Sequence, residues 1–463
     1  MQISSAAQST LNSSPVLTDP EQLLRPFQRA FKPPEAFRVG TEAEKFGVVR
    51  EGLAPLPFEG EVSLSALFTR FTTRGWKPLR EYSEGPVVGL QRGSSSITLE
   101  PGGQLELSGA PFASIHDTAR EFEQHFAELS EFSAELGILW LSAGFHPLAA
   151  PAEFPLVPKL RYPVMRRYLS QRANRGLDMM FRTCTVQANL DYSDEQDALR
   201  KLRVALALQP IVTAMFANSP FVEGEISGRL SERGDVWLEM DPDRTGLLPF
   251  LWQRSATFRD YVDWALDVPC FLVRRGAKVV ENTGQTFRRF MSHGFGGTRA
   301  VESDWVTHLN TLFPEVRLKS TIEVRGADAQ SKELTCALPA LWKGLLYDER
   351  SLAKLEDLLS SLDPVSVADS RREMTRDGLN AQLGGRLVRH WAEQVFEIAK
   401  QGLLRNPDRN EAGQCEDVYL APLGQFLERG LTPAQLLVEQ VRAGAPWRGS
   451  GLREGIVEVT RIL

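Results

Sequence analysis

Two glutamates stand two residues apart in the stretch "RVGTEAEKFGVV", which runs from Arg38 to Val49. Small and apolar residues flank Glu42 and Glu44, so the stretch predicts a strand, and residues two apart on a strand point to the same face. Carboxylates so close repel each other, and burying them is unfavourable unless a positive charge lies between them. An exposed edge strand with solvated glutamates is the alternative to a site that holds a cation.

Other predicted strands repeat this pattern of polar side chains at alternate positions. The residues concerned are Glu100 and Glu106 around the turn at 101–103, Gln187, Asn189 and Asp191 in "TVQANLDYS", and Glu323 and Arg325 in "STIEVRG". One solvated strand explains one such pair, whereas the repetition predicts a sheet with a polar, concave face and helices behind its apolar side. Hard cations such as Mg²⁺ prefer oxygen ligands and usually share them with substrate phosphates. The glutamates therefore predict a metal-dependent site.

Arginines supply the opposite charge. The loop-like stretch "GRLSERGDVWLEMDPDRTGLLPF" carries Arg229, Arg233 and Arg244, and Arg182 precedes Gln187. A guanidinium group suits phosphate and carboxylate because it donates two parallel hydrogen bonds, although a surface salt bridge is the alternative for each arginine taken singly. The sequence contains no Walker A motif, no GxGxxG after a strand, no HExxH and no GxSxG.

These residues alone support a Mg²⁺-dependent enzyme that acts on an anionic, phosphorylated substrate. They leave an ATP-using ligase and a metal-dependent phosphohydrolase open, and a non-catalytic binding module is a third interpretation. The net charge of −6 argues against a protein that binds nucleic acid through its phosphates.

The elements that must position these residues follow one another in a mixed order. Periodicity and caps predict helices over 19–31, 63–75, 114–138, 194–218 and 338–362, and strands over 39–49, 86–111, 139–147, 179–193 and 317–328. This order predicts an α+β fold around an antiparallel sheet rather than a doubly wound fold. Because the chain becomes almost wholly helical from about Val365, we predict a catalytic core over 20–363 and a helical C-terminal region over 364–463 packed on it.

Length and composition are those of a large globular protein. With 463 residues, of which 42% are hydrophobic, the chain can bury a large core. The Ser-rich residues 1–19 lack a basic residue and an apolar run, which predicts a disordered tail rather than a signal or transit peptide. No apolar run reaches the roughly 18 residues of a membrane helix. Four scattered cysteines without a CxxC motif are typical of a reducing compartment, so we expect a cytoplasmic protein.

The chain closely resembles the glutamate–cysteine ligases of plants and proteobacteria over roughly residues 35–350. The resemblance lies in long segments, among them "VGTEAEKFG", "SITLEPGGQLELSGAPF", "LDMMFRTCTVQANLDYS", "DPDRTGLLPF" and "HLNTLFPEVRLKSTIEVRGAD". It implies a fold related to the catalytic core of glutamine synthetase, with a curved antiparallel sheet around the active site. It also implies that L-glutamate, L-cysteine and ATP, with Mg²⁺, give γ-glutamylcysteine through a γ-glutamyl phosphate, as the first step of glutathione synthesis. A relative that joins glutamate to another amine is the alternative.

The resemblance also assigns roles to residues. The Mg²⁺ ligands that it implies are Glu42, Glu44, Glu100, Glu106 and Glu323. Arg325 and Arg233 correspond to clamps for phosphate or glutamate. Gln187 stands where some relatives have a metal-binding His. We expect Gln187 and Asn189 to bind substrate, and Tyr261 is the candidate for the cysteine pocket. The partners are then small molecules, and the protein is a monomer or a homodimer.

Redox control is where this sequence departs from its plant relatives. Plant members that resemble this chain carry a cysteine pair in the segment that corresponds to residues 279–305, and this segment contains none. Cys184, Cys270 and Cys336 lie in apolar stretches that indicate buried, unreactive thiols. Only Cys415, in "NEAGQCEDVY", is expected to be exposed, so we predict little dependence of activity on oxidation.

Overall fold

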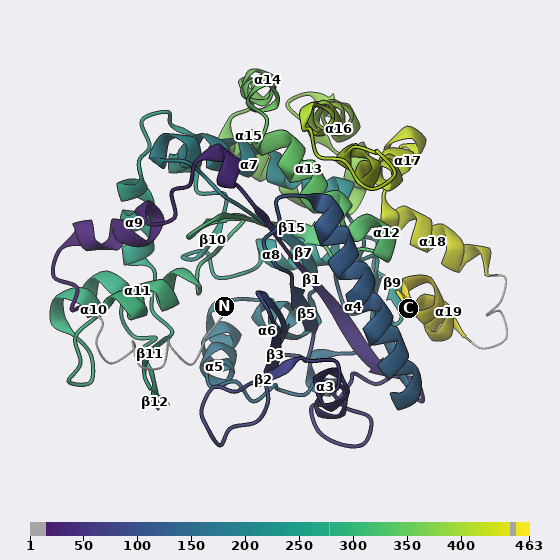
Figure 1. The fold of residues 1–463 in the computed structure, drawn as a ribbon, viewed down its shortest axis with the longest axis horizontal. Helices are drawn as coiled ribbons and strands as arrows, with labels where there is room; N and C mark the ends of the chain where they lie inside the picture. Colours follow the sequence, from purple (N-terminus) through teal and green to yellow (C-terminus); the bar gives the residue numbers. More distant parts are fainter. Residues whose placement is uncertain (1–14, 277, 445–450) are drawn as a thin grey trace.

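A nine-stranded sheet runs through the middle of the computed structural model, which describes residues 15–276, 278–444 and 451–463 (Figure 1). Neighbouring strands of this sheet are antiparallel. Their order is β14 (Val316–Leu318), β15 (Ile322–Asp328), β7 (Thr185–Leu190), β1 (Val39–Val49), β5 (Leu105–Ser108), β4 (Ser95–Leu99), β3 (Gly89–Arg92) and β2 (Lys77–Leu79), with β6 (Ile138–Leu141) beside β1. The predicted α+β class is confirmed.

Strand β1 organises the sheet, because its first part pairs with β5 and β7 while its last residues pair with β6. Burial alternates along it as the sequence predicts. Val39, Ala43 and Lys45 are buried on one face, whereas Glu42 and Glu44 are partly exposed on the other. The apolar positions of β1, β7 and β15 belong to the main hydrophobic core.

Two long helices, α4 (Ile115–Leu136) and α7 (Glu195–Met215), and the shorter α13 (Ala337–Leu346) cover the apolar face of the sheet. Helix α4 begins after Ser114, whose side chain caps it, and ends at Gly137, whose φ of 71° is readily adopted only without a Cβ. Its His125 lies 3.3 Å from the Lys45 amine, measured from Nε2 to Nζ. Because Lys45 points away from Glu44 on β1, this contact fixes α4 behind the polar face.

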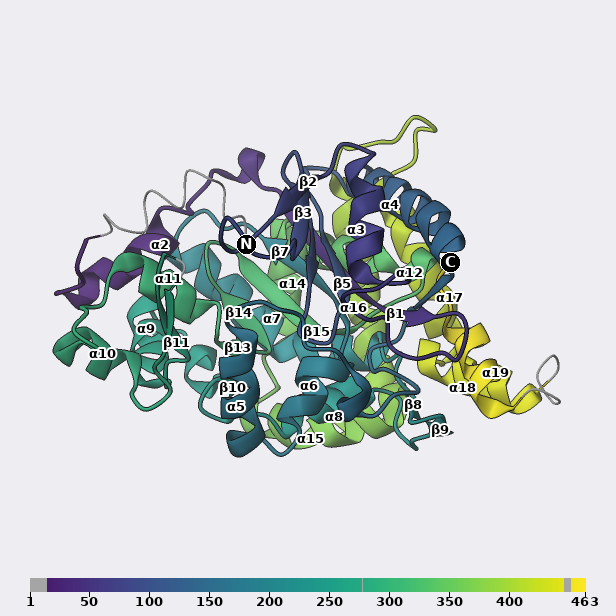
Figure 2. The ribbon, with the colours of Figure 1, turned by 90° about the horizontal axis from the view of Figure 1, so that it is seen from below.

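The helices α5 (Tyr162–Arg172), α6 (Gly176–Arg182) and α8 (Glu232–Leu238) lie together in the lower part of Figure 2. Helix α6 corrects the prediction of a strand over 179–193, because only Thr185–Leu190 is extended. An ion pair of 2.5 Å between Asp178 and Arg182, four residues apart, stabilises the helical turn.

Where the structure describes residues 364–463, they are mostly helical, with a small hairpin of β16 (Gln382–Leu383) and β17 (Arg386–Leu387). Helix α14 (Glu349–Leu359) precedes this region, whose helices are α15 (Pro364–Asp377), α16 (Val388–Arg405), α17 (Ala421–Arg429), α18 (Pro433–Ala443) and α19 (Leu452–Thr460). Helix α16 packs on α13, and Trp342 and Trp391 belong to one hydrophobic core. This core extends to both sides of residue 363, so a domain boundary there stays a prediction.

The remaining elements are short. They are α2 (Arg25–Gln28), α3 (Leu64–Thr72), α9 (Phe258–Asp267), α10 (Phe287–His293), α11 (Glu302–Leu309), α12 (Lys332–Thr335), β8 (Phe221–Val222), β9 (Glu225–Ile226), β10 (Thr245–Gly246), β11 (Leu272–Arg275), β12 (Lys278–Glu281) and β13 (Phe313–Pro314), besides six 3-10 turns. The side chain of Asp19 caps the 3-10 turn Pro20–Leu24, and that of Ser63 caps α3.

Of the stretch 1–19, for which we predict a disordered tail, the structure describes residues 15–19. Residues 1–14 lie outside the described residues. Leu17 is buried, and its N–H donates to the carbonyl of Ala300 at 2.9 Å. An apolar side chain with a place in the core orders residues 15–19, which the Ser-rich composition of the stretch does not indicate.

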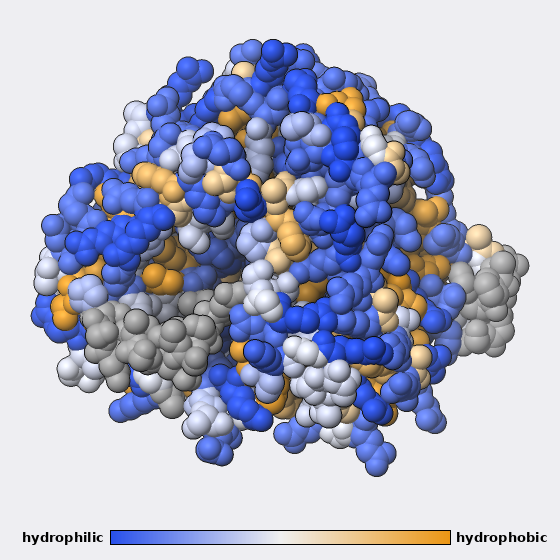
Figure 3. Space-filling model, in the orientation of Figure 1, coloured by the Kyte–Doolittle hydropathy of each residue, from blue (hydrophilic) through white to orange (hydrophobic). Residues whose placement is uncertain are grey.

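The outer surface in the view of Figure 1 is mostly hydrophilic, and it is hollowed left of its centre (Figure 3). Within the described ranges, none of the helices has the length and apolar character that crossing a membrane requires. The four cysteines are all described, and none is bonded to another; burial raises the pKa of Cys270 and of Cys336 to about 12. Cys415 is half-buried rather than exposed.

Candidate active site

The register of the sheet brings the predicted polar residues onto one face. Side chains directly opposite each other on neighbouring strands lie within reach of one another. The pairs are Glu42 with Gln187, Glu44 with Glu106, and Glu323 with Asn189. The alternation seen in separate segments of the sequence is therefore one continuous surface over β15, β7, β1 and β5.

Glu42 and Glu44 lie in the middle of this surface. The amide of Asn189 donates to Glu42 Oε1 at 3.0 Å, and the backbone N–H of Thr185 donates to Glu44 Oε2 at 2.9 Å. Burial, with repulsion from Glu106, raises the pKa of Glu42 to about 7 and the pKa of Glu44 well above its ordinary value. Without a bound cation, the folded chain therefore disfavours the charged forms of Glu42 and Glu44. A cation between them would favour these charged forms.

Glu106 and Glu100 extend the carboxylate surface toward β4. Glu106 accepts hydrogen bonds from the hydroxyl groups of Ser108 and, at 3.3 Å, Thr98. Glu100 follows β4 directly, and its Oε1 lies 4.0 Å from the Arg161 guanidinium. Our reading of the sequence missed Arg161, whose only signal is a basic residue in "PKLRYP" before α5.

Glu323 differs from the other carboxylates because cations surround it. Arg317 donates from Nη2 to Glu323 Oε1 at 2.7 Å, and Lys319 and Arg325 also form ion pairs with it. Burial would raise the pKa of Glu323, but these three cations outweigh it and hold that pKa well below the ordinary value. The sequence analysis missed Arg317 and Lys319, because it predicts one strand over 317–328, whereas a hairpin between β14 and β15 places Arg317 directly opposite Glu323.

Two predicted arginines meet at the middle of β15. Arg325 donates from Nη1 to Gln187 Oε1 at 2.8 Å, and its carbonyl accepts from Arg233 Nη2 at 2.7 Å. Arg233 comes from α8, is 2% exposed, and its Nε has no hydrogen-bond partner among the described residues. Burial lowers the pKa of Arg233, whereas in Arg325 the attraction of Glu323 outweighs burial and raises the pKa.

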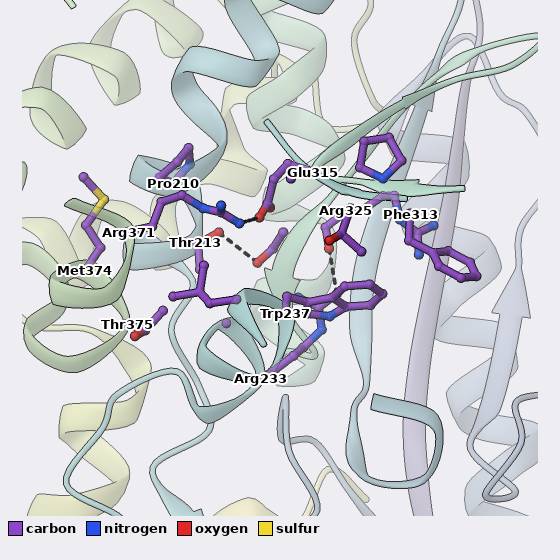
Figure 4. Close-up of a pocket in the computed structure, with 16 residues that line it drawn as sticks. Pro210, Thr213, Arg233, Trp237, Phe313, Glu315, Arg325, Arg371, Met374 and Thr375 are labelled. Atoms are coloured by element: carbon purple, nitrogen blue, oxygen red, sulfur yellow. Dashed lines mark hydrogen bonds and ion pairs between the residues drawn. The ribbon is translucent and has the colours of Figure 1, made fainter. Parts of the chain in front are cut away.

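A narrow pocket that opens to solvent lies beside these arginines (Figure 4). Trp237 and Phe313 form an aromatic wall, and the Arg325 guanidinium lies 5.9 Å from the centre of each ring. On the opposite side Glu315 and Arg371 point toward each other and form an ion pair. The pocket therefore combines a buried cation, Arg233, and a half-buried one, Arg325, with an apolar wall, which suits a negatively charged group of a substrate.

The remaining predicted substrate residues occupy two different places. Asn189 lies in the polar face, where its Oδ1 accepts from the Thr321 hydroxyl at 3.1 Å. Tyr261 lies in the core: its side chain is fully buried, its ring packs on Trp264, and its hydroxyl accepts from the Leu318 N–H at 3.2 Å. The structure thus gives Tyr261 a contact with the backbone of β14 and does not bring it to the cavity wall.

The oxygen donors of the polar face fit a hard cation in their chemistry. In the described part of the chain, no three His, Cys, Asp or Glu side chains converge into a complete metal centre. Mg²⁺ usually takes one or two carboxylates and completes its six ligands with water and substrate phosphate. Glu42 and Glu44 suit such a partial set, because burial and repulsion from Glu106 raise the pKa of both carboxylates, and a cation would offset this.

A concave polar sheet with clustered carboxylates, facing arginines and a small cavity is typical of enzymes that handle anionic substrates with a divalent cation. The family model described as glutamate-cysteine ligase family 2 (GCS2) matches residues 38–455. The chain belongs to this family.

Relatives and a solved structure agree with this assignment. Glutamate–cysteine ligase B, chloroplastic, of Oryza sativa subsp. japonica is 43% identical over 429 residues, which cover 91% of this chain and 84% of that protein. The chloroplastic glutamate–cysteine ligase of Arabidopsis thaliana is 41% identical over 441 residues, or 94% and 82%. The crystal structure of glutamate–cysteine ligase from Francisella tularensis in complex with AMP has a TM-score of 0.53 at 13% identity, covering 92% of this chain and 87% of that one. The last comparison concerns the fold alone.

The expectation of a cytoplasmic protein is contradicted by these relatives, because both are chloroplastic enzymes. The expectation rested on unpaired cysteines and on a Ser-rich N-terminal stretch. Unpaired thiols indicate a reducing environment and do not distinguish the cytosol from another reducing compartment.

Proposed function

We propose that this chain joins the γ-carboxylate of L-glutamate to the amine of L-cysteine at the expense of ATP, as the first step of glutathione synthesis. A γ-carboxylate oxygen attacks the γ-phosphorus of ATP, ADP leaves, and γ-glutamyl phosphate forms. The cysteine nitrogen then attacks the acyl carbon, loses a proton, and displaces phosphate to give γ-glutamylcysteine. Membership of the glutamate–cysteine ligase family over residues 38–455 is the observation that carries this proposal.

The proposed roles of Arg325 and Arg233 follow from the charge that both steps bring together. A carboxylate must approach a triphosphate, and phosphate must later leave, so fixed positive groups lower both barriers. The two arginines lie beside one cavity and are joined through the carbonyl of Arg325. We propose that Arg233 binds glutamate, because its Nε is buried and has no partner among the described residues. Arg325 then faces the reacting phosphate.

We propose that Mg²⁺ is held by the carboxylates of the polar face: Glu42, Glu44, Glu100, Glu106 and Glu323. When bound, it neutralises phosphate charge. The raised pKa values of Glu42 and Glu44 support their part, because a cation removes the repulsion that raises them. Glu323 already has three cationic partners, so its assignment as a ligand depends most on the outcome of mutation.

The amide residues support the substrate side of the proposal. Gln187 accepts a hydrogen bond from Arg325, and Asn189 joins Glu42 to Thr321. We propose that these amides align the arginine and the carboxylate with the substrates. We propose that Tyr261 acts on substrate binding indirectly, through the backbone of β14, which its hydroxyl contacts.

Phosphate release from ATP tests the proposed function directly. The purified protein is incubated with ATP, Mg²⁺ and glutamate, together with cysteine, alanine or 2-aminobutyrate. We expect release to require glutamate and to be fastest with cysteine. Equal rates with the three amines would overturn the assignment of cysteine and favour a ligase for another amine. Release without any amino acid would indicate a phosphohydrolase.

A further inference from the structure

Asp328 is a fully buried carboxylate that the polar face does not use. It is the last residue of β15, beyond the register shift between Val324 and Ala327. Its carboxylate accepts three hydrogen bonds, and the donors are the N–H of Asn218 at 2.8 Å, the hydroxyl of Ser219 at 2.6 Å and the hydroxyl of Ser231 at 2.9 Å. A buried carboxylate with such a full set of donors holds them in defined positions.

The hydroxyl groups of Ser219 and Ser231 also bond to the first turn of α8. Ser219 Oγ accepts from the backbone N–H of Arg233 at 3.2 Å, and Ser231 Oγ accepts from the N–H of Gly234 at 3.0 Å. A hydroxyl has one proton to donate, and both protons go to Asp328. The oxygen lone pairs are thereby turned toward the first turn of the helix, at the residue whose side chain reaches the cavity.

The surroundings leave Asp328 little freedom to move. A Cβ on Gly144 would lie 2.3 Å from the Asp328 Cγ, so the backbone of residue 144 presses directly on the carboxylate. The amide of Asn218, next to Ser219, donates to the carbonyls of Ser142 and Ala329 at 2.9 and 2.8 Å. Strand β15 and the start of α8 are therefore joined by a rigid, buried network.

We propose that Asp328 is a positioning residue for the binding of glutamate, and that it acts on Arg233 through Ser219, which holds the N–H of Arg233, and Ser231, which holds the N–H of Gly234. The inference rests on the proposed function, in which Arg233 binds glutamate. A helical turn that is held at the N–H groups of residues 233 and 234 keeps Arg233 Nη2 on the carbonyl of Arg325 and the Arg233 side chain in the wall of the cavity. Loosening this turn weakens the bidentate contact with a carboxylate, which depends on geometry.

Steady-state kinetics of Asp328→Asn test the inference. Asparagine keeps the size of the side chain but loses the charge and one acceptor. We expect the KM for glutamate to rise about tenfold, the effect of weakening one hydrogen bond to a charged group, with the KM for ATP within about twofold. In an Arg233→Lys background the same change should add less than about twofold, since the clamp is already impaired.

Variants of Ser231 keep the test open if Asp328→Asn does not fold. Ser231→Ala should raise the KM for glutamate, whereas Ser231→Thr retains a hydroxyl and should restore it. Ser63→Ala is the matched control, because Ser63 caps α3 in the same way, with its Oγ 3.1 Å from the Ala66 N–H. This control should lower the melting temperature and leave the KM for glutamate unchanged.

Three results would overturn the inference: a glutamate KM of Asp328→Asn within twofold of the wild type, an equal rise in the KM for ATP, or a full tenfold effect in the Arg233→Lys background. A folded Ser231→Ala with the wild-type KM would do the same. Failure of the proposed function is seen separately, as a wild-type protein that releases no phosphate with glutamate and cysteine, and that result overturns both.

Discussion

Replacing Glu42 by Gln removes a charge that the folded chain disfavours. Burial and its carboxylate neighbours raise the pKa of Glu42 to about 7 from 4.5. The folded state therefore binds this proton more tightly than the unfolded state does. The proton on Glu42 stabilises the folded state by its full amount below about pH 4.5, and this stabilisation is lost as the pH rises through about 7.

The size of the effect follows from the pKa difference. At about 1.4 kcal/mol per pH unit, ionised Glu42 lowers the free energy of unfolding by about 3 kcal/mol near pH 8. Glu42→Gln keeps the hydrogen-bonding shape and removes the charge. In metal-free buffer we expect the variant to be more stable than the wild type at about pH 8, by an amount of this order, and equally stable near pH 4.5.

Activity should change in the opposite direction. If Glu42 holds Mg²⁺, the amide weakens the site, and kcat should fall by at least about a hundredfold, as it does when one electrostatic contact of the transition state is lost. Mg²⁺ should raise the melting temperature of the wild type at about pH 8 much more than that of the variant.

Thermal unfolding from about pH 5 to 8, with and without Mg²⁺, run beside the phosphate-release assay, checks both expectations. Glu106→Gln serves as a comparison, because Glu106 is a further proposed ligand and lies opposite Glu44. Near-wild-type turnover of Glu42→Gln at saturating Mg²⁺ would refute the metal assignment. A stability difference that does not vary with pH would refute the electrostatic reasoning.

Three further predictions concern other residues. Glu323→Gln should also lower kcat at least about a hundredfold; near-wild-type turnover would leave Glu323 as a partner of Arg317 and Lys319 only. Arg233→Lys should raise the KM for glutamate far more than the KM for ATP, because lysine lacks the bidentate geometry, and equal effects would contradict the glutamate role. Activity should change little between reducing and mildly oxidising buffer when substrate cysteine is kept reduced; a reversible several-fold change with a new disulfide band on a non-reducing gel, through Cys415 for example, would contradict this.

Local pattern was enough to predict the polar face of the sheet. Side chains two apart on a strand share a face whatever the rest of the chain does, so Glu42 with Glu44 and Glu323 with Arg325 could be paired without a structure. Helix caps such as Ser63 and Ser114 are equally local, because the cap and the N–H that it accepts lie within three residues. Helix α6 was predicted as part of a strand, because its apolar residues 179–181 run on toward β7. The ion pair between Asp178 and Arg182 instead favours a helical turn.

The charge balance of the site depended on the tertiary structure. Glu42 and Glu323 belong to the same kind of alternating strand, yet one carboxylate is short of positive charge and the other has three cationic partners. Arg233 reaches the carbonyl of Arg325, 92 residues further along the chain, and Tyr261 is buried behind β14 instead of lining the cavity. A strand's periodicity fixes the direction of a side chain, whereas its burial and its distant neighbours are set only when strands and helices pack, and these determine its pKa and its role.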